Sequence, residues 1–179
     1  MSSTNRWVRC SLGHDHWGSA GAAGLLLAHV DAAGGTWVLL QHRAAWVHLG
    51  DTWSVPGGAL HEDEPAVDGA LREVVEEAGI DLRGVAAVLD TYVDDHGGWA
   101  YTTVLATAEA MFDPDVADDA AGGPSNDPAW ALPRERLEQE RLAWWRSGEV
   151  GGLRLHPGFA ATWPLVSKLL DALVAGPRG

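Results

Sequence analysis

The sequence predicts an α/β fold in which helices pack on a mixed β-sheet, and three observations lead to this prediction. Short strand-like segments occur in pairs, helix-like segments lie between the pairs, and no repeat or long linker divides the 179 residues. This pattern is typical of α+β proteins and of mixed α/β/α sandwiches. With 46% hydrophobic and 21% charged residues, the chain is expected to form a single globular domain over residues 1–179.

The first strands are predicted directly after an N-terminal segment, residues 1–19. Residues 21–30 read GAAGLLLAHV, a short apolar run that indicates a buried strand. Gly34 and Gly35 mark a turn, and residues 36–43 supply the partner strand of a hairpin.

A short extended segment and a helix are expected next. Residues 51–60 read DTWSVPGGAL and break at a Pro-Gly-Gly turn. Asp63 or Glu64 is suited to cap the helix, Pro65 to occupy its first position, and Gly79 to follow its last turn.

The second half of the chain contains further strands and two more helices. The predicted elements are strands at 85–95 and 98–108 joined at His96 and Gly97, an acidic loop at 109–128, a short strand at 129–133, a helix at 134–148, and a helix at 156–176 in which Pro164 marks a bend or the true start.

The central helix has two unlike faces. At 100° per residue, one side carries an apolar stripe that consists of Val67, Ala70, Leu71, Val74 and Ala78. The opposite flank carries three glutamates, Glu73, Glu76 and Glu77, with Arg72 beside them. Like charges at this spacing repel by a few tenths of a kcal/mol per pair.

Two interpretations account for the glutamates. Glu-rich helix faces are most often solvated surface. Alternatively, a hard divalent cation such as Mg²⁺ takes carboxylate oxygens as ligands and turns the repulsion into attraction, with Arg72 holding one carboxylate in place. The glycines before the helix favour the second interpretation, because they let backbone carbonyls approach a ligand closely.

Residues 58–80 read GALHEDEPAVDGALREVVEEAGI and resemble the Nudix box. This motif consists of Gly, five residues, Glu, seven residues, Arg-Glu, an aliphatic residue, any residue, Glu-Glu, any residue, Gly and an aliphatic residue. Every specified position matches: Gly58, Glu64, Arg72, Glu73, Val74, Glu76, Glu77, Gly79 and Ile80. With seven fixed letters at fixed spacing, the motif is highly specific.

The resemblance implies an α/β/α sandwich and a MutT-like hydrolase that cleaves a diphosphate with Mg²⁺ or Mn²⁺. It implies metal ligation by Glu73, Glu76 and Glu77, together with the carbonyl of Gly58. Arg72 and Glu64 would orient these ligands. Gly57 and Gly79 would shape the loops on either side of the helix.

The general base is left open by the sequence. Members of the family often carry a further glutamate shortly before a later tryptophan, whereas this chain reads SNDPAW there, with Asp127 as the nearby carboxylate. Glu73, Asp127, Glu109 and Asp119 are therefore all candidates.

The resemblance says little about the group attached to the diphosphate. A nucleoside triphosphate, including an oxidised one, is the expected substrate. ADP-ribose or another nucleoside diphosphate conjugate is the alternative. A nucleotide-binding regulatory module without turnover is a further alternative, although such members usually lose a box residue and this chain keeps them all.

Four residues outside the box are candidates for substrate binding. The guanidinium of Arg43 can fork onto phosphate oxygens, or it can be a solvated charge at a strand end. Trp53, Trp99 and Tyr101 can stack on a base, although core filling is the usual role of such side chains.

Net charge and cysteine content limit the partners. A net charge of −13 disfavours a nucleic acid polymer, whose binding depends on basic residues. A small anionic substrate then requires metal cations or a local positive pocket to offset the negative electrostatic potential of the protein. One cysteine and no long apolar run favour a cytoplasmic protein that does not enter a membrane. Because many relatives form dimers, a homodimer is one assembly that the resemblance suggests.

One further group of residues is noted near the N-terminus. Cys10, His14 and His16 lie close together in the sequence. They resemble half of a transition-metal site, but no matched second pair of ligands follows in the sequence. A loop or strand edge near the pocket is therefore the favoured interpretation, and the role of these three residues stays open.

Overall fold

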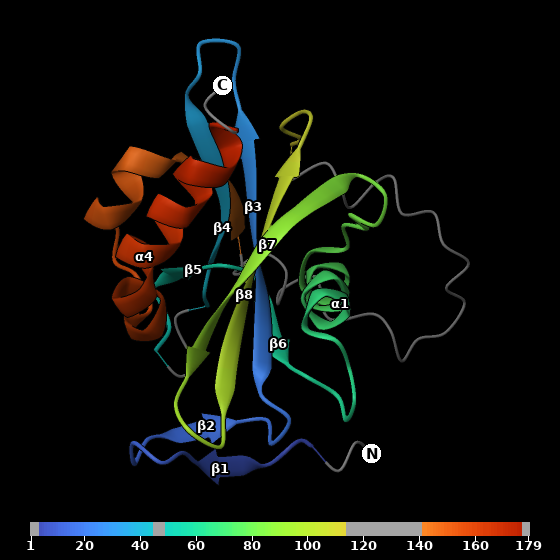
Figure 1. Cartoon of the computed structure of the whole chain (residues 1–179), viewed down its shortest axis with the longest axis vertical. Coiled ribbons are helices and arrows are strands. Elements are labelled where there is room, and N and C mark those ends of the chain that lie inside the picture. The colour runs from blue at the N-terminus through green and yellow to red at the C-terminus, as the bar shows by residue number, and fades with distance from the viewer. Residues whose placement is uncertain (1–3, 45–48, 114–140, 177–179) are drawn as a thin grey trace.

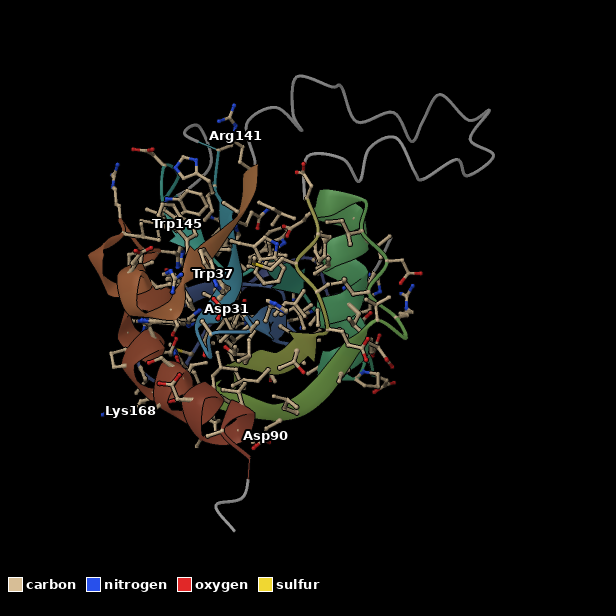
Figure 2. All side chains as sticks on the ribbon, turned by 90° about the horizontal axis from the view of Figure 1, so that it is seen from above. Asp31, Trp37, Asp90, Arg141, Trp145 and Lys168 are labelled. Atoms are coloured by element: carbon tan, nitrogen blue, oxygen red, sulfur yellow. The ribbon has the colours of Figure 1, made fainter. Side chains whose placement is uncertain are left out.

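The computed structural model describes residues 4–44, 49–113 and 141–176. The predicted first hairpin is confirmed, with β3 (Ala22–Val30) antiparallel to β4 (Thr36–His42). Asp31 closes the turn, because its carboxylate accepts hydrogen bonds from the Gly35 amide at 2.7 Å and from the Trp37 indole at 2.9 Å (Figure 2).

The predicted extended segment forms two short strands, β5 (Trp53–Ser54) and β6 (Gly57–Ala59). β6 pairs antiparallel with β3, where Gly57 lies opposite Gly24. A side chain on Gly57 would overlap the carbonyl oxygen of Ala23, so this close approach of two strands requires glycine.

The central helix α1 (Ala66–Ala78) ends as predicted but begins differently. Gly79 adopts the left-handed conformation at φ 68°, and its amide donates to the carbonyl of Val75. The predicted cap is wrong: Pro65 lies at the cap position, and no side chain caps the helix. Glu64 does not cap because Arg72 and the His61 amide bind its carboxylate.

The second predicted hairpin is confirmed as β7 (Ala86–Asp95) and β8 (Ala100–Ala108). β8 also pairs with β3, and this pairing is parallel, from Ala22 opposite Tyr101 to Ala28 opposite Thr107. The sheet is therefore mixed. Among the described residues, the strand order is β5-β4-β3-β8-β7, with β6 on β3 and β9 (Arg141–Arg146) on β4.

The predicted helix at 134–148 is wrong over its second half, because β9 (Arg141–Arg146) is a strand that pairs antiparallel with β4. Its side chains alternate: Trp144 packs on one face of the sheet and Trp145 on the other. Tryptophan suits such a pleated, half-buried position. Residues 114–140 lie outside the described part, together with the predicted strand at 129–133 and most of the acidic loop.

The chain ends in a 3-10 segment, η1 (Ser147–Gly152), and a long helix, α4 (Pro157–Val174). His156 caps α4 by accepting a hydrogen bond from the Gly158 amide. Pro164 lies inside α4 and therefore does not mark its start.

The predicted α/β/α sandwich is confirmed, because α1 and α4 cover opposite faces of the sheet (Figures 1 and 2). Consecutive side chains of β3 point alternately into the two hydrophobic cores, one on each face of the sheet. Leu25 and Leu27 pack under α1, whereas Leu26 packs under α4. Within the apolar stripe of α1, Ala70 and Val74 are fully buried as expected, and Val67 and Leu71 are partly buried against the same core.

A separate hairpin, β1 (Trp7–Arg9) and β2 (Asp15–Trp17), lies at the end of the sheet beside the turn between β7 and β8 (Figure 1). Among the described residues, no helix has both the length and the apolar content needed to cross a membrane.

Candidate functional site: the carboxylates of helix α1

Arg72 binds three carboxylates of the box, those of Glu64, Glu73 and Glu76. Its guanidinium donates two hydrogen bonds to the carboxylate of Glu64, at 2.8 and 2.9 Å. It also donates to Glu73 at 2.7 Å, to Glu76 at 3.0 Å and to the carbonyl of Ala59 at 3.0 Å. One side chain thus ties the loop before α1 to two glutamates of the helix.

The hydrogen bonds from Arg72 change the pKa of Glu64. Hydrogen bonds from Arg72 lower the pKa of Glu64 to about 2, although burial opposes the shift. The same pairing raises the pKa of Arg72. Glu64 is therefore an anion under all ordinary conditions, and its role in this geometry is to hold Arg72 in place.

Glu73 is more enclosed than Glu76. Its side chain is 13% exposed, against 54% for Glu76. Burial raises the pKa of Glu73, and this effect outweighs the stabilisation of the carboxylate by Arg72. Its oxygens face Gly58, where an added Cβ would lie 2.5 Å from Oε2. The absence of a side chain at Gly58 is what leaves room for this carboxylate.

Glu77 faces the same strand from the next turn of the helix. Its carboxylate accepts a hydrogen bond from the Gly57 amide at 3.0 Å. Glu73 and Glu77 therefore both lie against β6, one beside each glycine. Glu76 lies on the exposed side of Arg72.

This donor set fits a hard divalent cation. Glu73, Glu76 and Glu77 offer carboxylate oxygens on one flank of α1, and the backbone of Gly58 lies beside Glu73. Oxygen ligands of this kind are what Mg²⁺ and Mn²⁺ select. Among the described residues, Arg72 is a cation bound to Glu73 and Glu76, and one positive charge does not balance the three carboxylates, which a divalent cation would neutralise.

One predicted substrate residue, Tyr101, lies within electrostatic range of Glu73, Glu77 and Arg43. Burial raises the pKa of the Tyr101 phenol, and the charges of Glu77 and Glu73 raise it further, whereas Arg43 opposes the shift. A second predicted substrate residue, Arg43, is therefore near Tyr101.

The two predicted tryptophans lie in different places. Trp53 packs against the rings of His42 and Trp145, at centroid distances of 4.8 and 5.2 Å. Trp99 stacks on His16 at 3.8 Å and donates its indole hydrogen to Gly18. Trp99 thus belongs to the surroundings of the N-terminal hairpin rather than to those of Trp53.

The candidates for the general base are only partly described. Glu73 lies in the site, and Glu109 is an exposed residue directly after β8. Asp127 and Asp119 lie outside the described residues.

The sandwich and the box on α1 together define a Nudix domain, and comparison with known proteins agrees. Residues 21–147 match the NUDIX domain family. The chain belongs to the Nudix hydrolase family, whose members generally use divalent metal ions.

Three similar proteins illustrate this relationship. A Nudix hydrolase from M. smegmatis, RenU, is 33% identical with a TM-score of 0.67, and the match covers 92% of this chain and 94% of that one. A putative 8-oxo-dGTP diphosphatase 3 from Mycobacterium tuberculosis is 38% identical over 88% of this chain. A nucleoside triphosphate pyrophosphatase/Nudix hydrolase fusion protein from Bifidobacterium longum is 37% identical over 93% of this chain. The matches span only 66% of the mycobacterial protein and 32% of the fusion protein.

The carbonyl of Ala59 is one partner of Arg72 that the sequence did not suggest. It accepts from the guanidinium at 3.0 Å. A backbone acceptor leaves no side-chain signal, so only the folded loop reveals it.

Proposed function

We propose that this chain is a Mg²⁺-dependent nucleotide pyrophosphohydrolase that converts a nucleoside triphosphate, including oxidised forms, to the nucleoside monophosphate and pyrophosphate. The observation that carries the proposal is the complete set of box carboxylates: Arg72 binds Glu64, Glu73 and Glu76, and Glu77 accepts a hydrogen bond from the amide of Gly57. The name of the mycobacterial relative, an 8-oxo-dGTP diphosphatase, supports an oxidised purine nucleotide as the substrate.

In this proposal Glu73, Glu76 and Glu77 hold the metal with the carbonyl of Gly58. When bound, the cation supplies charge neutralisation for the diphosphate and a lower pKa for the attacking water. Mn²⁺ would satisfy the same oxygen donors.

The remaining polar residues position the ligands and the substrate. Arg72 and Glu64 fix the orientation of Glu73, because the guanidinium binds both carboxylates at once. Arg43 binds the phosphates, which its electrostatic interaction with Tyr101, a neighbour of Glu73 and Glu77, supports. Stacking of Trp53, Trp99 or Tyr101 on the base stays a prediction.

The proton of the attacking water goes to one carboxylate. Glu73, Glu109, Asp119 and Asp127 are the four candidates. Replacing Glu109, Asp119 and Asp127 in turn by the corresponding amide should identify the base, because loss of a general base lowers kcat by about 10²-fold or more while leaving KM nearly unchanged. If none of the three changes lowers kcat in this way, Glu73 is the remaining candidate, since its own amide variant would also lose a proposed metal ligand.

A nucleotide panel tests the function. The full chain with Mg²⁺ should release pyrophosphate from at least one nucleoside triphosphate, and the double variant Glu76→Gln, Glu77→Gln should not. Glu149→Gln is the matched control, because it removes an exposed carboxylate on η1 without touching α1. Hydrolysis of ADP-ribose alone would redirect the proposal to nucleoside diphosphate conjugates. Binding without turnover across the panel would overturn it in favour of a regulatory module.

A further inference from the structure

Four side chains that can bind a transition metal converge at the end of the sheet, far from α1 in the fold (Figure 1). Cys10 follows β1, His14 precedes β2, His16 lies in β2, and His96 lies in the turn between β7 and β8. Each offers a ligand atom, and the four atoms all lie within 4.8 Å of one another. We call these residues the Cys–His cluster.

The distances in the cluster are close to those of a tetrahedral metal site. The Cys10 thiol lies 4.0 Å from Nδ1 of His96, and the rings of His16 and His96 are 4.8 Å apart. With zinc–nitrogen bonds of about 2.0 Å and zinc–sulfur bonds of about 2.3 Å, ligand atoms in a tetrahedral site lie about 3.3 to 3.6 Å apart. The donors would need to move inward by about 1 Å.

One histidine is oriented as metal-bound histidines usually are. Nε2 of His96 lies 3.0 Å from a carboxylate oxygen of Asp94. When Nε2 donates its hydrogen to Asp94, the lone pair of Nδ1 faces Cys10. A carboxylate that fixes the tautomer and the ring in this way is a recurrent partner of histidine ligands.

A second histidine presents a polar atom that needs a partner. Nε2 of His16 is buried, and among the described residues it has no hydrogen-bond partner. Its ring is held by stacking on Trp99, with an interplanar angle of 7°. Buried polar side-chain atoms are nearly always satisfied, so an unsatisfied one calls for an explanation. A cation in the cluster would supply it.

The backbone holds the two loops together without help from a metal. Ser11 donates to the carbonyl of Gly97 from its amide at 2.9 Å and from its hydroxyl at 3.0 Å. Within the first loop, the Cys10 amide donates to the carbonyl of His14 at 2.9 Å. The donors from residues 10–16 are therefore already placed against His96, which lowers the entropy cost of binding an ion.

We propose that the Cys–His cluster is a structural zinc site, in which Cys10, His14, His16 and His96 fasten the β1–β2 hairpin to the turn between β7 and β8. Nitrogen and sulfur donors select zinc over the hard cations that suit the α1 carboxylates. Four protein ligands fill a tetrahedral sphere, and such closed sites are structural rather than catalytic. The inference does not depend on the proposed function.

Cobalt absorption provides a direct test. The full chain without a histidine tag is stripped with a chelator, reduced with a phosphine and titrated with Co²⁺ in excess Mg²⁺, which competes for the α1 carboxylates. One equivalent should produce tetrahedral visible bands and a thiolate-to-cobalt charge-transfer band. One equivalent of Zn²⁺ should abolish both. Because the chain has a single cysteine, the charge-transfer band can only report Cys10.

Substitutions within the Cys–His cluster test whether the metal binds there rather than elsewhere on the protein. Cys10→Ser should lose the charge-transfer band, and His14→Gln, His16→Gln and His96→Gln should each weaken Zn²⁺ binding by at least about tenfold. His29→Gln is the matched control, since His29 lies on β3 outside the cluster and should keep the wild-type affinity. Zinc should raise the Tm of the wild type and of His29→Gln but not that of Cys10→Ser.

The proposal is overturned if the folded wild type gives no charge-transfer band at stoichiometric Co²⁺. It is also overturned if all three histidine variants keep the wild-type spectrum and affinity. Circular dichroism establishes that each variant is folded. If Cys10→Ser or His96→Gln does not fold, His14→Gln decides the question, because the side chain of His14 is exposed.

Discussion

The α1 carboxylates and the Cys–His cluster are two ways of gathering metal-binding side chains in one small chain. The donors on α1 and β6 come from one stretch, residues 58–77, and they are oxygens. The donors of the cluster are nitrogen and sulfur, and they come from residues 10–16 and from His96, 80 or more positions further along. The first group consists of carboxylates braced by Arg72, whereas the second consists of imidazoles and a thiol, whose ligand atoms must be deprotonated to bind an ion.

The two groups therefore depend on the tertiary fold to different extents. The α1 group needs one helix, one turn and one arginine, all local in the sequence. The cluster exists only after the β1–β2 hairpin has docked beside the β7–β8 turn. The two groups should therefore respond independently to mutation, and four changes test that independence, from the largest expected effect to the smallest.

The largest effect is expected from the double variant Glu76→Gln, Glu77→Gln. Hydrolysis should fall by about 10²-fold or more, because two of the three anionic ligands become neutral. Glutamine keeps an acceptor for the Gly57 amide, so the loop should stay in place. Steady-state pyrophosphate release measures the loss, and the zinc-induced rise in Tm should persist. Activity within about threefold of wild type would exclude these carboxylates as ligands.

Arg72→Lys should destabilise the protein by about 2 to 3 kcal/mol, because an ammonium cannot replace the fork that binds Glu64 and Glu73 together. Urea unfolding measures the change. Arg83→Lys is the matched control, since Arg83 is 57% exposed and forms one surface pair with Asp81. It should change the unfolding free energy by less than about 0.5 kcal/mol. Equal effects of the two variants would contradict the bracing role of Arg72.

Glu64 should make the protein sensitive to acid. Its pKa falls from 4.5 to about 2 on folding because Arg72 binds the carboxylate. As the pH falls, the unfolded chain takes up a proton at Glu64 near pH 4.5, whereas the folded protein does so only near pH 2. The stabilisation is therefore present above pH 4.5 and is lost as the pH falls toward 2. Glu64→Gln should flatten the stability profile in that window, measured by urea unfolding at several pH values in chelator. A wild-type slope in the variant would show that Glu64 does not contribute.

The smallest effect is expected from Gly97→Ala. Gly97 has a φ of 70°, and an added Cβ would lie 2.7 Å from the hydroxyl oxygen of Ser11. Stability should fall by about 1 kcal/mol, and zinc affinity should fall because the two loops separate. Hydrolysis should not change.

Gly98→Ala is the matched control for this variant. Gly98 has a similar φ of 79°, but an added Cβ would meet nothing within 4 Å. It should carry the same backbone strain and keep the zinc affinity. If both variants bind zinc equally well, contact between Ser11 and Gly97 does not hold the cluster together.

The parts that the sequence predicted are those whose cause is local. The left-handed turn at Gly79 requires a residue without Cβ, and the apolar stripe that includes Val74 follows from helical periodicity, so both are visible in a short window. The box spacing places the α1 carboxylates together for the same reason.

The parts that it missed depend on distant partners. Trp144 and Trp145 occur in a segment that also fits a helix, and only pairing with β4 makes that segment a strand. His96 is an ordinary turn residue until the hairpin lies beside it. In the sequence, Glu64 stands where a helix cap is expected. In the fold, its carboxylate binds Arg72 instead, because this charged hydrogen bond is the stronger interaction.

The parallel pairing of β3 with β8 has a consequence for the order in which the chain can assemble. β3 is the central strand, yet its parallel neighbour lies 79 positions later, at Ala22 opposite Tyr101. The outer strand β9 meets β4 only at residues 141–146. During translation, the outer backbone edges of the β3–β4 hairpin therefore stay unpaired until most of the chain has been synthesised.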